Sequence, residues 1–295
     1  MDLPEEFRKN IVEVYGEDGK RWLANLPAHL QTLSRLYDLR SLRPMKNLSY
    51  NFVATVENSK QEKWVLKTGP AGADYRKETS WLKQNAKVSP RVHFFDQENN
   101  AFFMDFVPST QTLQDLVYEG HDDQATHVLA DLIVKMYGDG KGIPQGVPHL
   151  STLISSFDFL HGKLPQAFVS KARTLWQELT TFSPGDVFLH GDLHHDNVLI
   201  TSDGAKVIDP HGYVGDPASE VGSMIYNPLG WEALHDEKVL QRRLYILSEC
   251  VPYDAKKIRA WAFVKTVLSI AWTVEGSGKV PSHELRIAEI LENEL

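Results

Sequence analysis

The residues most able to do chemistry lie together in the stretch FLHGDLHHDNVLI, residues 188–200. Asp192 and Asn197 are five positions apart on a loop between two short apolar runs, which are typical of strands. Asp209 follows the next strand-like run, KVI, twelve positions after Asn197. Oxygen donors at the ends of adjacent strands suit Mg²⁺, which prefers hard oxygen ligands and keeps several waters. We therefore expect Asn197 and Asp209 to hold Mg²⁺, and Asp192 to serve as a base that faces a substrate hydroxyl.

This division of roles is that of phosphoryl transfer. The stretch HGDLHHDN fits the H-x-D-x-x-x-x-N spacing of a kinase catalytic loop, in which a later aspartate binds the metal that bridges the nucleotide phosphates. The competing interpretation is a hydrolytic zinc site made of His190, His194 and His195. It is the weaker one, because adjacent His194 and His195 point apart and no H-E-x-x-H pattern is present. His190 is interpreted as a structural residue that braces the loop.

A kinase also needs a strand lysine to hold the α- and β-phosphates and a helix glutamate to orient that lysine. Lys67 in WVLK ends a strand-like run, and Glu78 lies eleven residues later in a segment with helical periodicity. Glu57 and Glu62 precede Lys67 on the predicted hairpin, so Glu78 is the better partner.

The expected phosphate-covering loop, PMKNLSYNFV, contains no glycine, and no P-loop motif G-x-x-x-x-G-K-[ST] is present. Main-chain amides and Ser49 could still contact phosphates, since backbone N–H groups need no particular side chain. The stretch FFMDFVPST is expected to be the hinge between two lobes, where adenine would pair with the main chain near Asp105 to Val107.

The elements that must position these residues follow a simple order. Residues 1–40 have helical spacing with a break expected at Pro27, and residues 50–58 and 62–69 are predicted to form a hairpin. A helix over 73–85 and two strands around QENN complete a β-rich N-terminal lobe, residues 1–106, and residues 107–295 read as a mostly helical C-terminal lobe. The fold class is therefore α+β.

The composition of the chain restricts the classes of ligand and the cell compartment that we expect. A net charge of −8 and a pI near 5.8 disfavour a nucleic-acid surface and permit a cationic ligand. No apolar run approaches the roughly 18 residues that cross a bilayer, and the acidic start MDLPEEFRKN is not a secretory signal. The single cysteine, Cys250, excludes an internal disulfide and fits a reducing compartment. We expect a cytoplasmic protein.

The motif HGDLHHDN resembles the HGDLHxxN signature of the aminoglycoside phosphotransferase group, small-molecule kinases of protein-kinase-like fold. The segments IDPHGYVGDPASEVGSMIYNP, NLSYNFVATV and WVLKTG resemble the subgroup of aminoglycoside/hydroxyurea resistance kinases, and the resemblance covers residues 45–275. It implies transfer of the γ-phosphate of ATP or GTP, with Mg²⁺, to a hydroxyl of a streptomycin-like aminoglycoside or to hydroxyurea.

The resemblance also implies that the acceptor lies over Asp192, against the helical lobe. Candidate carboxylates for a cationic acceptor are Asp216 and Glu220 in GDPASE and Glu275 in AWTVEG. Glu220 stands where the wider group commonly has aspartate. Two other functions stay open because fold and motif do not settle a substrate. One is a kinase for a metabolite hydroxyl, such as an amino alcohol or a sugar, and the other is an inactive nucleotide-binding module.

Overall fold

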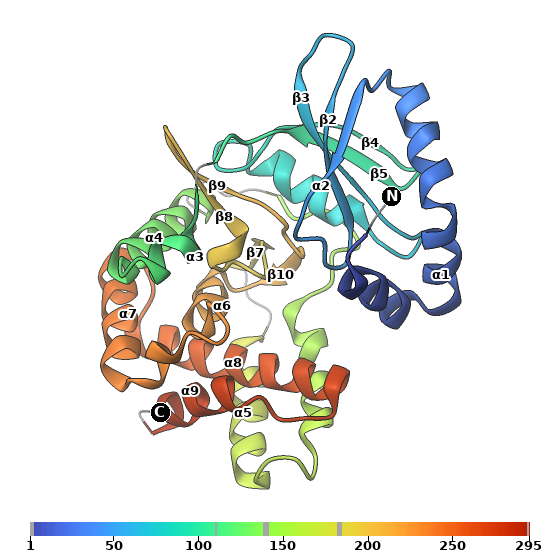
Figure 1. Cartoon of the computed structure of the whole chain (residues 1–295). Helices are drawn as coiled ribbons and strands as arrows, with labels where there is room; N and C mark the ends of the chain where they lie inside the picture. Colours follow the sequence, from blue (N-terminus) through green and yellow to red (C-terminus); the bar gives the residue numbers. More distant parts are fainter. Residues whose placement is uncertain (1–2, 110, 138–141, 182–184, 294) are drawn as a thin grey trace. The chain divides into compact units, whose positions relative to one another are not determined.

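A computed structural model describes residues 3–109, 111–137, 142–181, 185–293 and 295. The chain divides into two compact units, Met1–Pro108 and Ser109–Leu295. The sequence analysis placed the boundary two residues earlier, after Phe106. The first unit contains a five-stranded sheet and two helices, and helices dominate the second unit (Figure 1). The predicted α+β class, with a β-rich first part and a helical second part, is confirmed.

The first unit is built on an antiparallel sheet in the order β1-β2-β3-β5-β4. Its strands are β1 (Ser41–Pro44), β2 (Phe52–Glu57), β3 (Lys63–Thr68), β4 (Val92–Asp96) and β5 (Ala101–Asp105). β2 and β3 form the predicted hairpin, with Phe52 opposite Thr68. β4 and β5 are the two strands expected around QENN, and helix α2 (Tyr75–Gln84) packs against both.

The N-terminal helix α1 (Glu5–Leu36) bends at a different residue from the one expected. The helix continues through Pro27, and its break lies at Gly16, whose backbone has φ 56° and ψ −131°. A positive φ of this kind favours glycine, which has no Cβ to clash. Gly19 assists, because a Cβ there would lie 2.4 Å from the carbonyl oxygen of Ile11. The prediction of a break at Pro27 is therefore wrong. The buried Leu26 and Leu30 on either side of Pro27 pack into the core and hold that part of the helix.

The second unit contains short strands and longer helices. Its helices are α3 (Leu113–Tyr118), α4 (Asp122–Tyr137), α5 (Gln166–Leu179), α6 (Val221–Tyr226), α7 (Glu237–Cys250), α8 (Ala255–Ser277) and α9 (Ser282–Glu292). Its strands are β6 (Gln111–Thr112), β7 (Val187–Leu189), β8 (Val198–Thr201), β9 (Gly204–Val207) and β10 (Tyr213–Gly215). β6, β8 and β9 form one small sheet, and β7 pairs with β10.

Helix α8 is the centre of this unit, with α5, α6, α7 and α9 packed on it. Most of its length is buried and its sequence is apolar on all sides, which is typical of a core helix. α6 approaches α8 closely because Gly222 has no side chain. A Cβ at Gly222 would lie 2.4 Å from Cγ of Lys265 and 3.1 Å from the carbonyl oxygen of Trp261.

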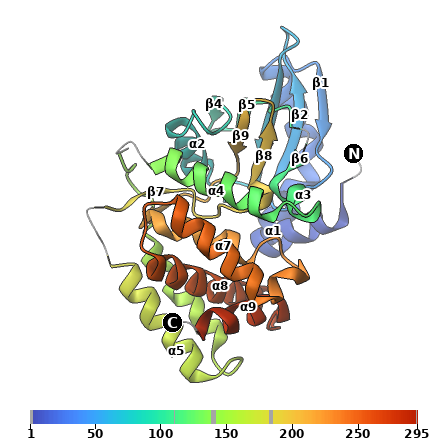
Figure 2. The ribbon, with the colours of Figure 1, turned by 90° about the vertical axis from the view of Figure 1, so that its left-hand side faces the viewer.

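A buried arginine ties the other helices together. Arg243 of α7 is fully buried, and its guanidinium donates to the Asp122 carboxylate at the start of α4, with a shortest distance of 2.6 Å. It also donates to the carbonyl oxygens of Met224 and Asn227 at the end of α6. Figure 2 shows α4 and α7 side by side. α4 begins at the Asp122-Asp123 pair, and the carboxylates of this pair form ion pairs with arginines of α7.

The described helices include none with the length and apolar character that a membrane span requires.

The contact between α6 and α8 gives a test with a matched pair of helical glycines. Gly222→Ala forces a Cβ against Lys265, so we expect the free energy of unfolding to fall by about 1–3 kcal/mol, as for an overpacked core. Gly276→Ala adds a methyl where no atom lies within 4 Å, so we expect a gain of about 0.5–1 kcal/mol from helix propensity. Urea unfolding of the two variants measures both values. Equal effects would contradict the close approach of α6 to α8.

Candidate active site

The first unit contains a buried ion pair between Lys67, which is expected to hold the phosphates, and Glu78, which is expected to orient that lysine. Lys67 lies in β3 and Glu78 in the first part of α2, and the Lys67 Nζ donates to Glu78 Oε1 at 2.9 Å. Both side chains are less than a tenth exposed. Removing two charges from water is costly unless they are paired, so this pair fixes both side chains. The lysine Nζ also lies 6.0 Å from the centre of the Tyr75 ring.

Two neighbouring contacts hold the pair in place. Asp74 caps α2 by accepting a hydrogen bond from the Arg76 amide at 3.1 Å, which sets where the helix begins. The Tyr75 hydroxyl donates to Asn51 Oδ1 at 2.7 Å. Asn51 ends the segment between β1 and β2 that was expected to cover phosphates, and Ser49 in the same segment is exposed. Ser49 is therefore accessible to a ligand within its own unit.

The expected hinge segment leaves one amide available. The Asp105 amide donates to the Arg91 carbonyl at 2.9 Å, and the Phe106 amide donates to the Lys63 carbonyl at 3.4 Å. Within the described chain the Val107 amide donates to no other group. Of the residues Asp105 to Val107, Val107 therefore has the main-chain donor best suited to a base.

In the second unit, His190 organises the catalytic-loop motif. Its Nε2 donates to the Ile208 carbonyl at 2.9 Å, and its Nδ1 accepts from the Asp192 amide at 3.2 Å. The His190 carbonyl in turn accepts from the amides of His211 and Gly212. Burial lowers the pKa of His190 to about 4, so the ring is neutral at pH 7 and can both donate and accept. This supports the interpretation of His190 as a structural brace.

Asp192 projects a partly exposed carboxylate from this loop. Its Oδ2 lies 3.4 Å from His194 Nε2 and 3.6 Å from His211 Nε2, and about a fifth of the side chain is exposed. Burial acts to raise the pKa of Asp192, but the hydrogen bond from His194 and the charges of nearby basic groups outweigh it, so the pKa lies well below its usual value. The carboxylate is therefore ionised throughout the physiological range.

The two expected metal ligands come from neighbouring points of one hairpin. β8 and β9 pair with Val198 opposite Val207, and the Ile208 amide donates to the Asn197 carbonyl at 3.0 Å. Asp209 is the next residue, is exposed, and has φ 61°, a left-handed conformation that aspartate tolerates better than most residues.

The donor set at Asn197 and Asp209 fits Mg²⁺. The Asn197 Nδ2 donates to the Asp192 carbonyl at 3.0 Å, which leaves Oδ1 as the atom that can face a cation. One amide oxygen and one carboxylate suit Mg²⁺, which completes its six ligands with water and substrate phosphates.

A buried polar network holds the main chain of the loop that carries Asp192. The Glu220 carboxylate accepts from the Tyr137 hydroxyl and, at 3.2 Å, from the Gly191 amide. The Tyr137 hydroxyl accepts from the His190 amide at 3.0 Å, and Lys265 Nζ donates to the Gly191 carbonyl at 2.9 Å. Burial raises the pKa of Glu220 and lowers that of Lys265. Both main-chain groups of Gly191 are thus fixed by buried side chains.

Gly191 itself must be glycine. Its φ of +85° is one that other residues rarely adopt, and a Cβ there would lie 2.9 Å from the Tyr213 ring.

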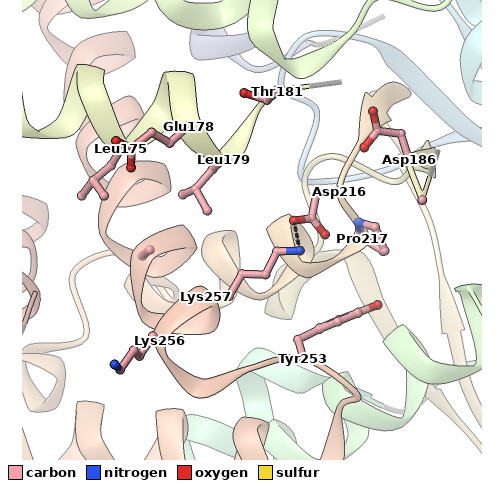
Figure 3. A pocket seen from close by; sticks show the side chains of 12 residues that line it. Leu175, Glu178, Leu179, Thr181, Asp186, Asp216, Pro217, Tyr253, Lys256 and Lys257 are labelled. Atoms are coloured by element: carbon pink, nitrogen blue, oxygen red, sulfur yellow. Dashed lines mark ion pairs between the residues drawn. The ribbon is translucent and has the colours of Figure 1, made fainter. Parts of the chain in front are cut away.

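Two residues expected to meet the acceptor have partners within the second unit. Glu220 is 2% exposed and fully engaged beneath the loop, so its carboxylate has no open face for a substrate. Asp216 caps the turn Pro217–Glu220 by accepting from the Ala218 amide, and also accepts from Trp261 Nε1 at 3.2 Å. Its ion pair with Lys257, at 2.5 Å, borders a cavity of about 600 Å³ (Figure 3). Glu275, near the end of α8, is exposed.

The zinc interpretation finds no support in the described part of the chain. Both ring nitrogens of His190 are bonded to the main chain, and His195 is fully buried. The described residues contain no group of three His, Cys, Asp or Glu side chains placed around a common metal position.

Sequence reasoning missed Lys265 and Tyr137, which fix the loop. A signal existed for Lys265, the one lysine in the apolar run WAFVKTVLSIAW. A lone charge in a core helix is retained where it has a buried partner. Tyr137 carries no such signal, because it ends an ordinary amphipathic segment.

A β-rich unit with a buried lysine–glutamate pair and a helical unit with a catalytic-loop motif define a protein-kinase-like fold. Solved structures agree. A choline kinase from Streptococcus pneumoniae has a TM-score of 0.62 with this chain at 14% identity, covering 89% of this chain and 95% of that one. At this identity the likeness shows the fold alone.

The sequence comparisons identify the family. Residues 53–277 match the family described as aminoglycoside/hydroxyurea antibiotic resistance kinase, and the chain belongs to it. It is similar to a streptomycin 6-kinase from Streptomyces griseus, at 23% identity over 99% of this chain and 97% of that protein. It is also similar to a streptomycin 3''-kinase from Klebsiella pneumoniae, at 28% identity over 68% of this chain and 75% of that protein. The chain is therefore a small-molecule kinase, a phosphotransferase with an alcohol group as acceptor.

The network beneath the loop can be tested at Tyr137. Tyr137→Phe removes the hydroxyl between Glu220 and the His190 amide, so we expect unfolding to become easier by about 1–3 kcal/mol, the cost of unsatisfied buried partners. We also expect kcat to fall about tenfold, equivalent to roughly 1.4 kcal/mol of transition-state stabilisation. Tyr118→Phe, at an exposed tyrosine of α3, is the control. Identical stability and kcat in the two variants would show that the network does not position the loop.

Proposed function

We propose that this chain transfers the γ-phosphate of ATP to a hydroxyl of a streptomycin-like aminoglycoside. The observation that carries the proposal is the arrangement of the loop around Asp192. Its carboxylate is ionised and partly exposed, and Asn197 is pinned by its amide to the Asp192 main chain. The streptomycin 6-kinase from S. griseus, which the chain matches over nearly its whole length, supports the acceptor class.

The nucleotide would be held by the first unit. Lys67, oriented by Glu78, would neutralise the α- and β-phosphates, and Ser49 with the neighbouring main chain would cover them. Adenine would pair with the main chain of Asp105 to Val107, where the Val107 amide is the available donor. GTP carries the same phosphates and is the donor to compare with ATP.

Asn197 and Asp209 would hold Mg²⁺ through one oxygen each. When bound, the ion neutralises charge on the nucleotide phosphates.

Asp192 would orient the acceptor hydroxyl. In the reaction the hydroxyl oxygen bonds to the γ-phosphorus, the bond from phosphorus to the ADP oxygen breaks, and Asp192 receives the proton. A carboxylate with a lowered pKa is a weak base, so proton transfer would come late, as a loose phosphoryl-transfer transition state allows. Rate enhancement would then come mainly from positioning and charge neutralisation.

The acceptor would be a cation, in keeping with the acidic chain. Asp216 and Glu220 would act by holding the loop and the turn that follows it, while Glu275 remains a proposed acceptor contact. Hydroxyurea belongs in the same acceptor panel, because the family description includes it. We place the activity in the cytoplasm, where an exposed thiol such as Cys250 stays reduced.

Two alanine variants test these roles in a coupled ADP-release assay with MgATP and streptomycin. We expect Asp192→Ala to lower kcat by about 10²–10⁴-fold, the range for a positioned base, with MgATP binding retained. Asp209→Ala should abolish turnover and also weaken MgATP binding, because it removes a metal ligand. The control is Asp203→Ala, at the exposed β8–β9 turn. Near-normal turnover by Asp192→Ala would refute the role of Asp192.

A further inference from the structure

The first part of α1 packs on the segment between β3 and α2. A Cβ at Gly72 in this segment would lie 3.3 Å from both Cδ1 and Cε1 of Tyr15, so the tyrosine ring lies directly on the glycine. Tyr15 is half-buried and packs against the core of the first unit. Earlier in α1, Asn10 Nδ2 donates to the Ser49 carbonyl at 3.4 Å. The first part of α1 therefore contacts both the segment that follows the Lys67 strand and the segment expected to cover phosphates.

The break in α1 fixes the position of Tyr15. Gly16, with φ 56° and ψ −131°, ends the first part of the helix directly after Tyr15, and Figure 1 shows the two parts of α1 at an angle to each other. Ile11 lies one turn before Tyr15 on the same face and is fully buried. The chain turns back onto Ile11 at Gly19, where a Cβ would lie 2.4 Å from the Ile11 carbonyl oxygen. The Tyr15 ring is thus held toward the first unit.

The Tyr15 hydroxyl lacks a protein partner. Among the described residues, none forms a hydrogen bond with it. Burial raises the pKa of Tyr15 and the charge of Lys67 acts in the opposite direction, so the hydroxyl is protonated at pH 7 and lies within the field of the lysine. A half-buried hydroxyl that no protein group accepts from has lost hydration without a replacement. A ligand with an anionic oxygen at this position would supply the missing acceptor.

Tyr75 is another tyrosine near Lys67, but its hydroxyl is engaged. Its ring centre lies 6.0 Å from Lys67 Nζ, and its hydroxyl donates to Asn51 Oδ1 at 2.7 Å. Of the two hydroxyls, that of Tyr15 is therefore available to an anion at Lys67. The covering segment PMKNLSYNFV contains no glycine, so its main chain approaches a phosphate less closely than a glycine-rich loop can. A side-chain donor from α1 would compensate for this.

We propose that the Tyr15 hydroxyl donates a hydrogen bond to a phosphate of the nucleotide, beside the Lys67 ammonium. The inference rests on the proposed use of ATP. Tyr15 lies outside residues 53–277, which match the family, so the family description does not assign it. Hydrogen bonds to phosphate oxygens are charge-assisted and stronger than neutral ones. Tyr15 is thus a nucleotide-binding residue that the N-terminal helix supplies.

The test is calorimetric binding of the magnesium complex of AMP-PNP, a non-hydrolysable ATP analogue, to the full chain. Tyr15→Phe removes the hydroxyl and keeps the ring on Gly72, so we expect the Kd to rise about tenfold, the effect of one lost hydrogen bond to a charged group. The matched control is Tyr37→Phe. Tyr37, directly after α1, donates to Asp96 Oδ2 at 2.7 Å, so this variant should unfold at a lower temperature with an unchanged Kd.

Thermal unfolding without nucleotide separates binding from folding. A raised Kd in Tyr15→Phe, with the unfolding temperature of the original chain, would support the inference. An unchanged Kd would overturn it, and so would an equal rise in Tyr15→Phe and Tyr37→Phe, because the loss would then come from a loosened unit. Failure of the original chain to bind AMP-PNP would refute both the inference and the proposed nucleotide. Tyr15-dependent binding without phosphorylation of streptomycin would support the inference and refute the proposed acceptor.

Discussion

The active-site half that carries Asp192 depends on the hydrogen bonds that hold the main chain of Gly191. The Glu220 carboxylate accepts from its amide and the Lys265 ammonium donates to its carbonyl, both from within the protein core. Burying a carboxylate or an ammonium group without a hydrogen-bond partner costs free energy. Here the amide and the carbonyl of Gly191 provide those partners. Asp192 is held in position because both main-chain groups of Gly191, the residue before it, are hydrogen-bonded to buried side chains.

Much of the second unit serves to place those two side chains. Gly222 lets α6 lie against the part of α8 that carries Lys265, because a Cβ there would clash with the lysine side chain. α6 is in turn held at its end by Arg243, which links it to Asp122 of α4, and α4 ends at Tyr137, the partner of Glu220. These contacts connect the buried Arg243 to the loop that carries Asp192. Helices that bind no ligand therefore help to hold the catalytic loop in place.

The sequence predicted what is local. Alternating apolar residues gave the β2–β3 hairpin, and fixed spacing gave the catalytic-loop motif with Asp192, Asn197 and Asp209. Contacts between distant segments could not be read in this way. Glu220 looked like an acceptor ligand because its type and spacing say nothing about burial, and the break in α1 was assigned to Pro27 because the packing that tolerates a helical proline is tertiary.

The central claim is that phosphate passes from ATP to the acceptor and not to water. The most direct measurement is phosphorus NMR of a reaction that contains the chain, MgATP and streptomycin, followed by the mass of the recovered antibiotic. We predict one new phosphomonoester signal, an increase of one phosphoryl group in streptomycin, and an equal amount of ADP. Release of inorganic phosphate with unmodified streptomycin would contradict the claim, and would show that the loop does not place an aminoglycoside hydroxyl against the γ-phosphate.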